Sequence, residues 1–555
     1  MPAVVAVQPR IRLAFPDAGR FDNDAIRART GFAVALLICA LVAGGSDARE
    51  PDILRRSNSG EPGTLDPHRG SSTAELIIIN DLFIGLLTRD AHGRVVPGAA
   101  SDYTVSADGV TWTFTLRNDL KWSDGTPMSS ADFLYSFRRS MDPVTASPTA
   151  SLLYPIRNAR AVNSGEMTPD RLGVFAPEAR LLIIELERPI PYFDRLLLIP
   201  AALPVPKHAI GKFGRRWSRP PNAVSNGAFV LTQWSPRVHV QVERNMHFYE
   251  RQSVRLRGVR YFPTEELSTQ LKRFRAGELD LGLNFPPSQA AWVRNNLGGS
   301  VRIFPIYGTY YFPINLTLEK FADVRTRRAM NIAIDREAIA FRLLGSGEQP
   351  AYSMVPPGFE FYPPLEPPRD SVLPLEERQE IARKLLADAG FGPSNPLEVE
   401  IRYNMTEEHQ AVAVAMASMW KAVGIRATVL STESRTHFRD LALGEFEVGR
   451  SAAFASYADP SAFLIRFSSG NQRDNYARYS NAMFDRLIDE SNNIFDPPLR
   501  AAILREAEAL ALGEFPVIPI YHYVSKRLVS PRVKGWRDNP AGTHLSRYLA
   551  LREES

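Results

Sequence analysis

Residues 375–403, LEERQEIARKLLADAGFGPSNPLEVEIRY, contain the helix-to-strand alternation that decides the fold class. Apolar residues recur at helical spacing from Leu375 to Ala389, and Gly390 follows at the position where a helix end favours glycine. The segment from Leu397 to Tyr403 then alternates in polarity, which is typical of a strand. Because helix followed by strand recurs as far as Leu430, the sequence predicts α/β domains.

Other segments extend this pattern along the chain. Residues 111–116, TWTFTL, alternate as a half-buried strand, and a turn at residues 121–127 follows. The quartet Ser129 to Asp132 fits a helix N-cap with an acidic first turn, so an amphipathic helix is predicted from Ala131 to Arg139.

Two further segments carry signals of this kind. Residues 324–344 have apolar residues at helical spacing, with Asp335 placed to cap a second helix. Residues 515–521, FPVIPIY, are predicted as a short strand. Its two prolines suit a sheet edge or a crossing between domains, and not the middle of a sheet.

Length and composition exclude several classes of protein. A chain of 555 residues is too long for one core, and two to four domains are expected. A mean hydropathy of −0.19 and 43 dispersed prolines argue against a polytopic membrane protein, a coiled coil or a disordered polymer. The net charge is only +5, and the basic residues are interleaved with acids instead of clustered. No nucleic-acid partner is therefore predicted.

The N-terminal region resembles an export signal. Residues 31–45 form an apolar run that is too short to span a membrane, with Arg27 and Arg29 before it and small residues around Ala48 after it. We predict a signal peptide over residues 1–48 and a periplasmic product. Lipoprotein anchoring at Cys39, the single cysteine, is disfavoured because the bulky Leu37 and Ile38 precede it.

Catalytic signatures are missing from the sequence. No G-x-S-x-G, H-E-x-x-H, Walker or G-x-G-x-x-G motif occurs, and the nine histidines are dispersed without metal-ligand spacing. We therefore expect a protein without catalytic residues, metal or cofactor. A secreted peptidase of an unlisted mechanism is kept as an alternative.

Several short blocks, in this order and spacing, resemble the oligopeptide-binding proteins of bacterial ABC importers, which are extracellular solute-binding proteins of family 5. The resemblance extends over nearly all of the chain after residue 50. The blocks are LDPH (65–68), DLFIGLL (81–87), WTF (112–114), KWSDGTP (121–127), PVPK (204–207), SNGAF (225–229), DVRTRRAMN (323–331), PAY (350–352), PVIPIY (516–521) and RLV (527–529).

The resemblance implies a periplasmic binding protein-like α/β fold (type II, cluster C), bilobal like a Venus flytrap, with two ligand-gripping lobes and an extra domain. Lobe I would comprise residues 49–83, 209–311 and 524–555, domain II residues 84–208, and lobe III residues 312–523. It also implies a monomer that captures oligopeptides or modified peptides and delivers them to the permease of an ABC transporter in the inner membrane.

The resemblance also assigns positions to a ligand site. Ser456 stands where the family has an aspartate that takes the peptide amine, with Asp459 nearby as an expected helix cap. Arg450 and His409 match cationic residues on the carboxylate side, and Leu441 replaces a second arginine. Backbone pairing with the peptide is implied for Ser71, Ser72 and Thr73 and, opposite them, for Ala453, Phe454 and Ala455. Ala453 and Thr149 replace larger aromatic residues, and Tyr310, Tyr311, Tyr521 and Tyr523 fall near the predicted crossings, with Tyr521 taken as a ligand contact.

The neutral Ser456 leaves the ligand class open. A hydroxyl cannot replace a buried charged partner, which contributes about 1.5–3 kcal/mol. Either another acid binds the amine, or the ligand lacks a free amine. A non-peptide solute (a glycan, a metal chelate or an opine-like conjugate) is therefore an alternative, as is a sensing or chaperone role in place of transport.

Overall fold

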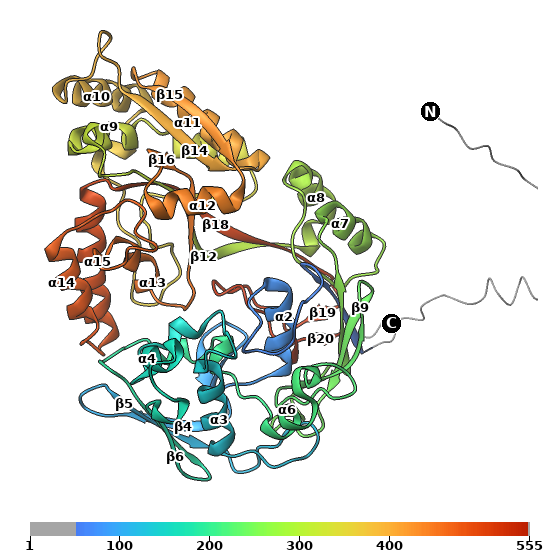
Figure 1. Cartoon of the computed structure of the whole chain (residues 1–555). Coiled ribbons are helices and arrows are strands. Elements are labelled where there is room, and N and C mark those ends of the chain that lie inside the picture. Colours follow the sequence, from blue (N-terminus) through green and yellow to red (C-terminus); the bar gives the residue numbers. More distant parts are fainter. Residues whose placement is uncertain (1–51, 553–555) are drawn as a thin grey trace, which may run out of the picture. The chain divides into compact units, whose positions relative to one another are not determined.

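The computed structural model of the chain describes residues 52–552. The predicted signal peptide, residues 1–48, and Cys39 lie outside the described residues. Helices and strands alternate along the described chain (Figure 1), so the predicted α/β class is confirmed. Between residues 52 and 552, no helix is long and apolar enough to cross a membrane.

The largest element is a nine-stranded sheet in which β12 and β18 are the longest strands. Its strand order is β17-β12-β18-β11-β1-β10-β9-β8, and β13 pairs with β18 beside this path. The strands are β17 (Ser451–Phe454), β12 (Val301–Pro313), β18 (Val517–Val529), β11 (Leu281–Gly282), β1 (Ile53–Asn58), β10 (Gly258–Pro263), β9 (His239–Arg244), β8 (Phe229–Ser235) and β13 (Gln349–Pro350).

The predicted edge character of residues 515–521 holds at Pro519. Most of the segment belongs to β18 and pairs with β12. On the other side of β18, β13 pairs with Tyr521 and His522 and β11 with Leu528 and Val529, so among the described residues no second strand pairs with Pro519. Pro519 is tolerated there because its partner Tyr311 lies at a register shift, where the ladder is already irregular. The carbonyl oxygen of Pro519 is also satisfied, by the Nε of buried Arg336 at 2.8 Å.

The helix and strand prediction for residues 375–430 is confirmed. α10 (Leu375–Asp388) precedes Gly390, whose φ of +90° is the left-handed conformation that glycine adopts without strain. β14 (Glu398–Asn404), α11 (Glu407–Lys421) and β15 (Arg426–Thr432) follow. β14 pairs in parallel with β15 and with β16 (Val448–Gly449), and α12 (Ser434–Leu443) connects β15 to β16.

The upstream predictions also hold. β5 (Thr111–Leu116) lies in a four-stranded antiparallel sheet of order β4-β5-β7-β6, beside α3 (Ser130–Met141). The backbone N–H of Ser129 donates to the Asp132 carboxylate at 2.8 Å, as the capping pattern requires. The remaining strands of this sheet are β4 (Ala100–Val105), β6 (Val174–Glu178) and β7 (Leu181–Glu185).

The helical prediction for residues 324–344 is confirmed with one difference. α9 (Val324–Ile332) is regular, and Asp335 accepts a hydrogen bond from the N–H of Ala338 at 3.0 Å. The second helix, residues 338–344, has π-helical geometry. The other named elements are α2 (Thr73–Leu82), β2 (Leu87–Arg89), β3 (Val95–Pro97), α4 (Ala159–Ser164), α5 (Phe193–Leu196), α6 (Lys207–Phe213), α7 (Leu267–Arg275), α8 (Ala290–Leu297), α13 (Ser461–Leu464), α14 (Ala482–Ser491), α15 (Pro497–Gly513), β19 (Val533–Lys534) and β20 (Ala550–Leu551).

The apolar side chains form several separate cores. One core joins residues from Leu54 to Tyr261 with a few near the C-terminus, and a smaller one lies around α7 and α8. Two further cores take nearly all their residues from positions 307–523. This separation fits a multidomain chain. The residue limits of lobe I, domain II and lobe III given above stay predictions.

One core position carries a buried acid. Glu508 of α15 has no exposed surface; its Oε1 accepts from the N–H groups of Met354 and Val355, and its Oε2 from the hydroxyl of Tyr362, at 2.7 to 2.8 Å. Burial raises the pKa of Glu508 from 4.5 to about 7. Glu508 therefore stays protonated in the folded chain at a pH where the unfolded chain is already ionised.

This difference predicts a specific pH dependence of stability. Between about pH 4.5 and 7 the folded state holds a proton that the unfolded state releases, so Glu508 lowers the free energy of unfolding as pH rises, by on the order of 3 kcal/mol. Glu508→Gln should remove this contribution. Denaturant unfolding at pH 5 and pH 7 should show the variant gaining stability over the wild type at pH 7 relative to pH 5. Glu506→Gln, an exposed position on the same helix, should show no such gain, and equal pH slopes for all three proteins would contradict the assignment.

Candidate functional site

Arg450 is a buried cation between β16 and β17. Its side chain donates from Nη2 to the hydroxyl of Tyr523 at 2.9 Å and from Nη1 to Oδ1 of Asn404 at 3.2 Å, and its guanidinium carbon lies 4.7 Å from the centre of the Tyr310 ring. Only 7% of the residue is exposed, and within residues 52–552 no carboxylate forms an ion pair with it. A buried arginine with neutral partners alone favours an anionic group from outside the chain.

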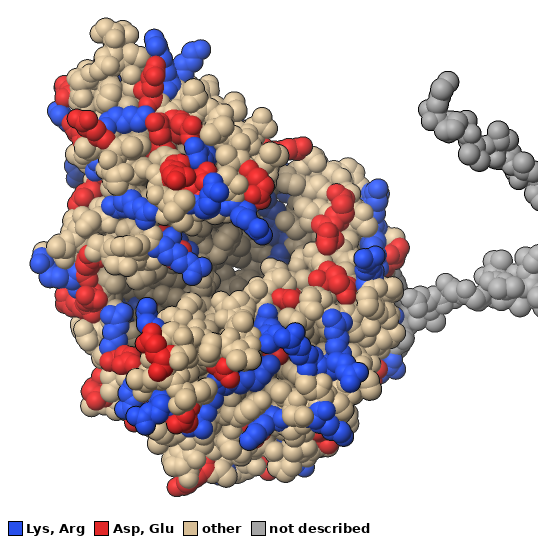
Figure 2. Space-filling view, in the orientation of Figure 1, with Lys and Arg blue, Asp and Glu red and all other residues tan. Residues whose placement is uncertain are grey.

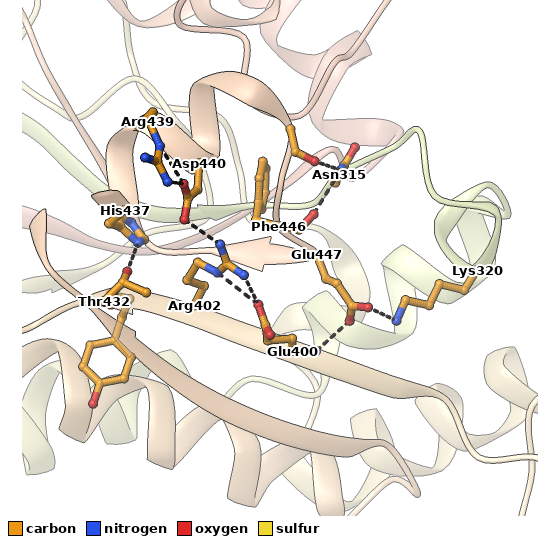
Figure 3. Close-up of polar contacts among 12 residues, drawn as sticks. Asn315, Lys320, Glu400, Arg402, Thr432, His437, Arg439, Asp440, Phe446 and Glu447 are labelled. Carbon is orange, nitrogen blue, oxygen red and sulfur yellow. Dashed lines mark hydrogen bonds and ion pairs between the residues drawn. The ribbon is translucent and has the colours of Figure 1, made fainter. Parts of the chain in front are cut away.

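The backbone of Arg450 is held by Arg402 and His437. Its N–H donates to the carbonyl of Arg402, and its carbonyl accepts from Nε2 of His437, both at 2.7 Å. Figure 3 shows the polar network around these two partners. Arg402 is fixed in turn by ion pairs with Glu400 at 2.9 Å and Asp440 at 2.8 Å. The position of Arg450 is therefore set by β14 and α12 as well as by its own strand.

Three tyrosines of the two long strands pack around this cation. The rings of Tyr310 and Tyr521 stack at 4.5 Å, and Tyr523 lies edge-on to Tyr521 at 5.1 Å. Tyr521, predicted as a ligand contact, has no exposed surface, and its hydroxyl donates to Glu408 at 2.7 Å. Tyr521 therefore positions Tyr310 and Glu408. Tyr311 is also buried and belongs to a neighbouring apolar core.

His409 lies close to Arg450 in space. It is on the first turn of α11, where its N–H donates to Thr406, and its Nδ1 lies 3.3 Å from the hydroxyl of Tyr310. Burial, with the charge of Arg450 adding to it, lowers the pKa of His409 to about 3. The imidazole is therefore neutral at neutral pH and adds hydrogen bonding without charge. Leu441, in place of a second arginine, is fully buried and packs beside Gly449.

β17 supplies a free strand edge next to Arg450. It ends the nine-stranded sheet, and the N–H of Ala455 just after it donates to the carbonyl of Tyr307 within β12. Since backbone groups alternate in direction along a strand, the N–H and C=O groups of Ala452 and Phe454 point away from β12. Ala453 is buried and Phe454 is 48% exposed, with its ring 4.8 Å from that of Tyr523. Such an edge can pair with another extended chain.

The predicted lobe I segment lies at the start of α2. Ser71, Ser72 and Thr73 are exposed, and Ser72 caps the helix in a capping box with Glu75. The backbone N–H groups of Ser71 and Ser72 donate to the Glu75 carboxylate at 2.8 and 2.9 Å. A ligand here would meet carbonyl and hydroxyl groups, because these two amides are already bonded.

The acid next to Ser456 is already paired. Ser456 is exposed after β17, whereas Asp459 is completely buried and forms ion pairs with Arg195 and, at 2.8 Å, with Arg500. Its Oδ1 also accepts from the N–H of Ser461 at 3.0 Å, which confirms the predicted role as a cap of α13. Although burial opposes ionisation, the two arginines lower the pKa of Asp459.

A cavity of about 700 Å³ adjoins this acid, and sequence reasoning missed it. Its walls come from segments far apart in the chain, so no local pattern could reveal it. They include residues 92–95, 191–195, 358–362, 458–460, 495–504 and 540–541 in part, together with Tyr307. A recess also opens on the face of the molecule in Figure 2, with Lys and Arg side chains at its rim. Among the described residues, no cluster of three or more His, Cys, Asp or Glu could hold a metal ion.

The chain has close relatives of known class. The family model of the bacterial extracellular solute-binding proteins, family 5, matches residues 94–475. The periplasmic murein peptide-binding protein MppA of Escherichia coli is 35% identical, over 93% of this chain and 96% of the relative. The periplasmic oligopeptide-binding protein OppA of the same organism is 36% identical (90% and 92%), and its probable deoxycholate-binding periplasmic protein YgiS is 35% identical (93% and 97%).

A solved structure agrees with this assignment. The unliganded open form of the periplasmic murein tripeptide-binding protein MppA superimposes with a TM-score of 0.83 at 35% identity, covering 90% of this chain and 98% of the other. The chain therefore belongs to the bacterial extracellular solute-binding proteins of family 5, with their periplasmic binding protein fold.

The buried ion pairs of Asp459 predict a large effect on stability. Asp459→Asn leaves Arg195 and the buried Arg500 without a counterion, so the free energy of unfolding should fall by about 3 kcal/mol. Urea unfolding followed by circular dichroism measures it. Asp489→Asn removes an ion pair between exposed partners and should change little; equal effects of the two substitutions would refute the structural role of Asp459.

Proposed function

We propose that this solute-binding protein captures short peptides in extended form and delivers them to the permease of an ABC importer. The observation that carries the proposal is the buried Arg450, which has no carboxylate partner within residues 52–552 and lies at the start of the free edge of β17. The edge offers main-chain hydrogen bonds that any peptide can make, and the arginine offers a partner for a carboxylate. Main-chain hydrogen bonding and carboxylate binding both serve to hold a ligand, and neither requires a catalytic step.

The cellular setting is proposed on the same basis. Relatives over 90% of the chain are named as periplasmic binding proteins, and residues 31–45 resemble the apolar part of an export signal. We infer cleavage near Ala48, action as a monomer in the periplasm, and a membrane permease as the receiving partner. Ser71 to Thr73 would face the ligand from the side opposite β17.

The role of Arg450 gives a direct test. Arg450→Ala should weaken binding of a tetrapeptide with a free carboxylate by about 10- to 100-fold, because charge-assisted hydrogen bonds contribute about 1.5–3 kcal/mol. A peptide amide should bind equally to both proteins. Titration calorimetry measures the affinities, with Arg450→Lys as a variant that keeps the charge and Arg251→Ala, at an exposed position, as the control. Unchanged carboxylate affinity in a folded Arg450→Ala protein would remove the proposed contact.

The strand-pairing mode predicts an alternating pattern along the ligand. Methylation of a peptide nitrogen that donates to the carbonyl of Ala452 or Phe454 should reduce affinity about tenfold, since it removes a donor and blocks the edge. Methylation of the next nitrogen should have a smaller effect. A methyl scan of one tetrapeptide, read by competition, tests it, and a flat profile would exclude pairing on β17.

A non-peptide carboxylate is the second candidate. The relative YgiS is named as probably deoxycholate-binding, and an amphipathic carboxylate could place its charge on Arg450 and its apolar body on Phe454, which is 48% exposed. Competition between deoxycholate and a tetrapeptide distinguishes the two: displacement of the peptide at low deoxycholate concentration supports the second candidate, and peptide binding without competition supports the first.

A further inference from the structure

A cluster of exposed cations surrounds α6. Residues 195–242 contain no aspartate or glutamate, although acids and bases are interleaved along the chain as a whole. The basic patch is defined by the exposed cations on α6, on the 3₁₀ helix Gly214–Arg216 and just after it, and at the tip of the β8–β9 hairpin: Lys207, Lys212, Arg215, Arg216, Arg219 and Arg237. Figure 2 shows more Lys and Arg than Asp and Glu side chains in this region, around α6 of Figure 1.

Two sets of contacts join the parts of the basic patch into one surface. The guanidinium carbon of Arg219 lies 3.3 Å from the centre of the Trp234 ring on β8. Glu61 accepts hydrogen bonds from Nε1 of Trp234 at 2.8 Å and from the backbone N–H of Arg237 at 3.0 Å. The segment after α6 and the hairpin tip therefore lie side by side.

The neighbouring acids leave the charges of the basic patch available. Asp124 is bound to His208, at 2.8 Å, and not to a lysine or arginine. Glu61 is close enough to Arg219 to act on its charge, but its carboxylate is held by Trp234 and by the hairpin backbone. Within residues 52–552, none of the six cations of the patch forms an ion pair with a carboxylate.

The surroundings of these cations suit a lipid surface. A Cβ atom added at Gly211 or Gly214 would meet no atom within 4 Å, so this segment stands out from the fold. Val238 at the hairpin tip is 60% exposed, and Phe213 lies half-buried beside the ammonium group of Lys212. Cations next to exposed apolar side chains are typical of surfaces that rest on anionic lipids, where the charges meet headgroup phosphates. Cations spread over two segments match many phosphates better than one small anion.

We propose that the basic patch binds the surface of a bilayer that contains anionic phospholipids. The inference goes beyond the proposed function, because it concerns the place where the protein works and not the ligand that it carries. Contact with the membrane that holds the permease would keep the loaded protein at a higher local concentration beside its receiving partner.

Co-sedimentation with vesicles tests the inference. The protein should bind vesicles of phosphatidylcholine mixed with phosphatidylglycerol, and not vesicles of phosphatidylcholine alone. The triple substitution Lys212→Gln, Arg215→Gln and Arg216→Gln should weaken binding to the mixed vesicles on the order of 100-fold, because each cation near an anionic surface contributes about fivefold. Added salt should weaken binding of the wild type as well, since it screens the charges.

A matched control separates the position of the charges from their number. Arg383→Gln, Lys384→Gln and Lys421→Gln remove the same charge from exposed positions of α10 and α11 and should leave vesicle binding unchanged. Peptide affinity and melting temperature should be the same for all three proteins. Because they share residues 1–51, that segment cannot cause a difference between them.

The possible outcomes are distinct. Equal binding to both kinds of vesicle, or an equal loss in the two triple variants, would overturn the inference. Absence of binding to the mixed vesicles would also overturn it; if the patch variant alone then lowered peptide uptake by cells, the partner would be an acidic protein surface. The proposed function survives each of these results and fails only if the wild type binds no peptide.

Discussion

The antiparallel pairing of β12 with β18 is the constraint on which the rest of the site depends. Val301 pairs with Leu528 at one end of the ladder and Pro313 with Val517 at the other, so two segments about 200 residues apart form one continuous ribbon. β17 pairs with β12 along this ribbon, and β11 joins its other end to β1. The free edge therefore has a fixed place relative to the strands on both sides of the ribbon.

The same pairing builds the environment of Arg450. Tyr310 comes from β12 and Tyr521 and Tyr523 from β18, so the ladder register determines that their rings meet. The Tyr310 ring lies against the guanidinium of Arg450, the Tyr523 hydroxyl accepts a hydrogen bond from it, and Glu408 is held by Tyr521. Arg450 is buried and hydrogen-bonds to neutral groups, with Glu408 held on Tyr521 instead of on the guanidinium, so its charge is weakly screened by water. Membership of the family accounts for the binding-protein fold. The register of β12 and β18 accounts for the position of the tyrosines around the positive charge of Arg450.

The parts of the structure that sequence could predict are local or familial. Residues 375–430 were predictable because helix periodicity, a glycine stop and strand alternation act within a few residues. Arg450 and His409 were predicted as ligand-site residues from the family resemblance alone, and the structure places both against Tyr310. The missing N–H of Pro519 correctly predicted a position with a strand on one side only, whereas the register shift beside it and the hydrogen bond from Arg336 depend on distant residues and could not be foreseen. The neutrality of His409 was equally invisible, because it depends on burial and on Arg450.

The cavity shows most clearly why the remaining site was beyond sequence reasoning. Asp194 and Asp459 are both ordinary acids in the sequence, and Asp459 is the one close to the family's amine position. In the folded chain Arg195 and Arg500, from segments about 300 residues apart, reach Asp459 and neutralise it. An acid with two arginine partners is satisfied and cannot attract a further cation without losing one of them. Asp194 is distant in sequence from β17 and comes to line the same cavity as Asp459, Arg195 and Arg500 only after folding.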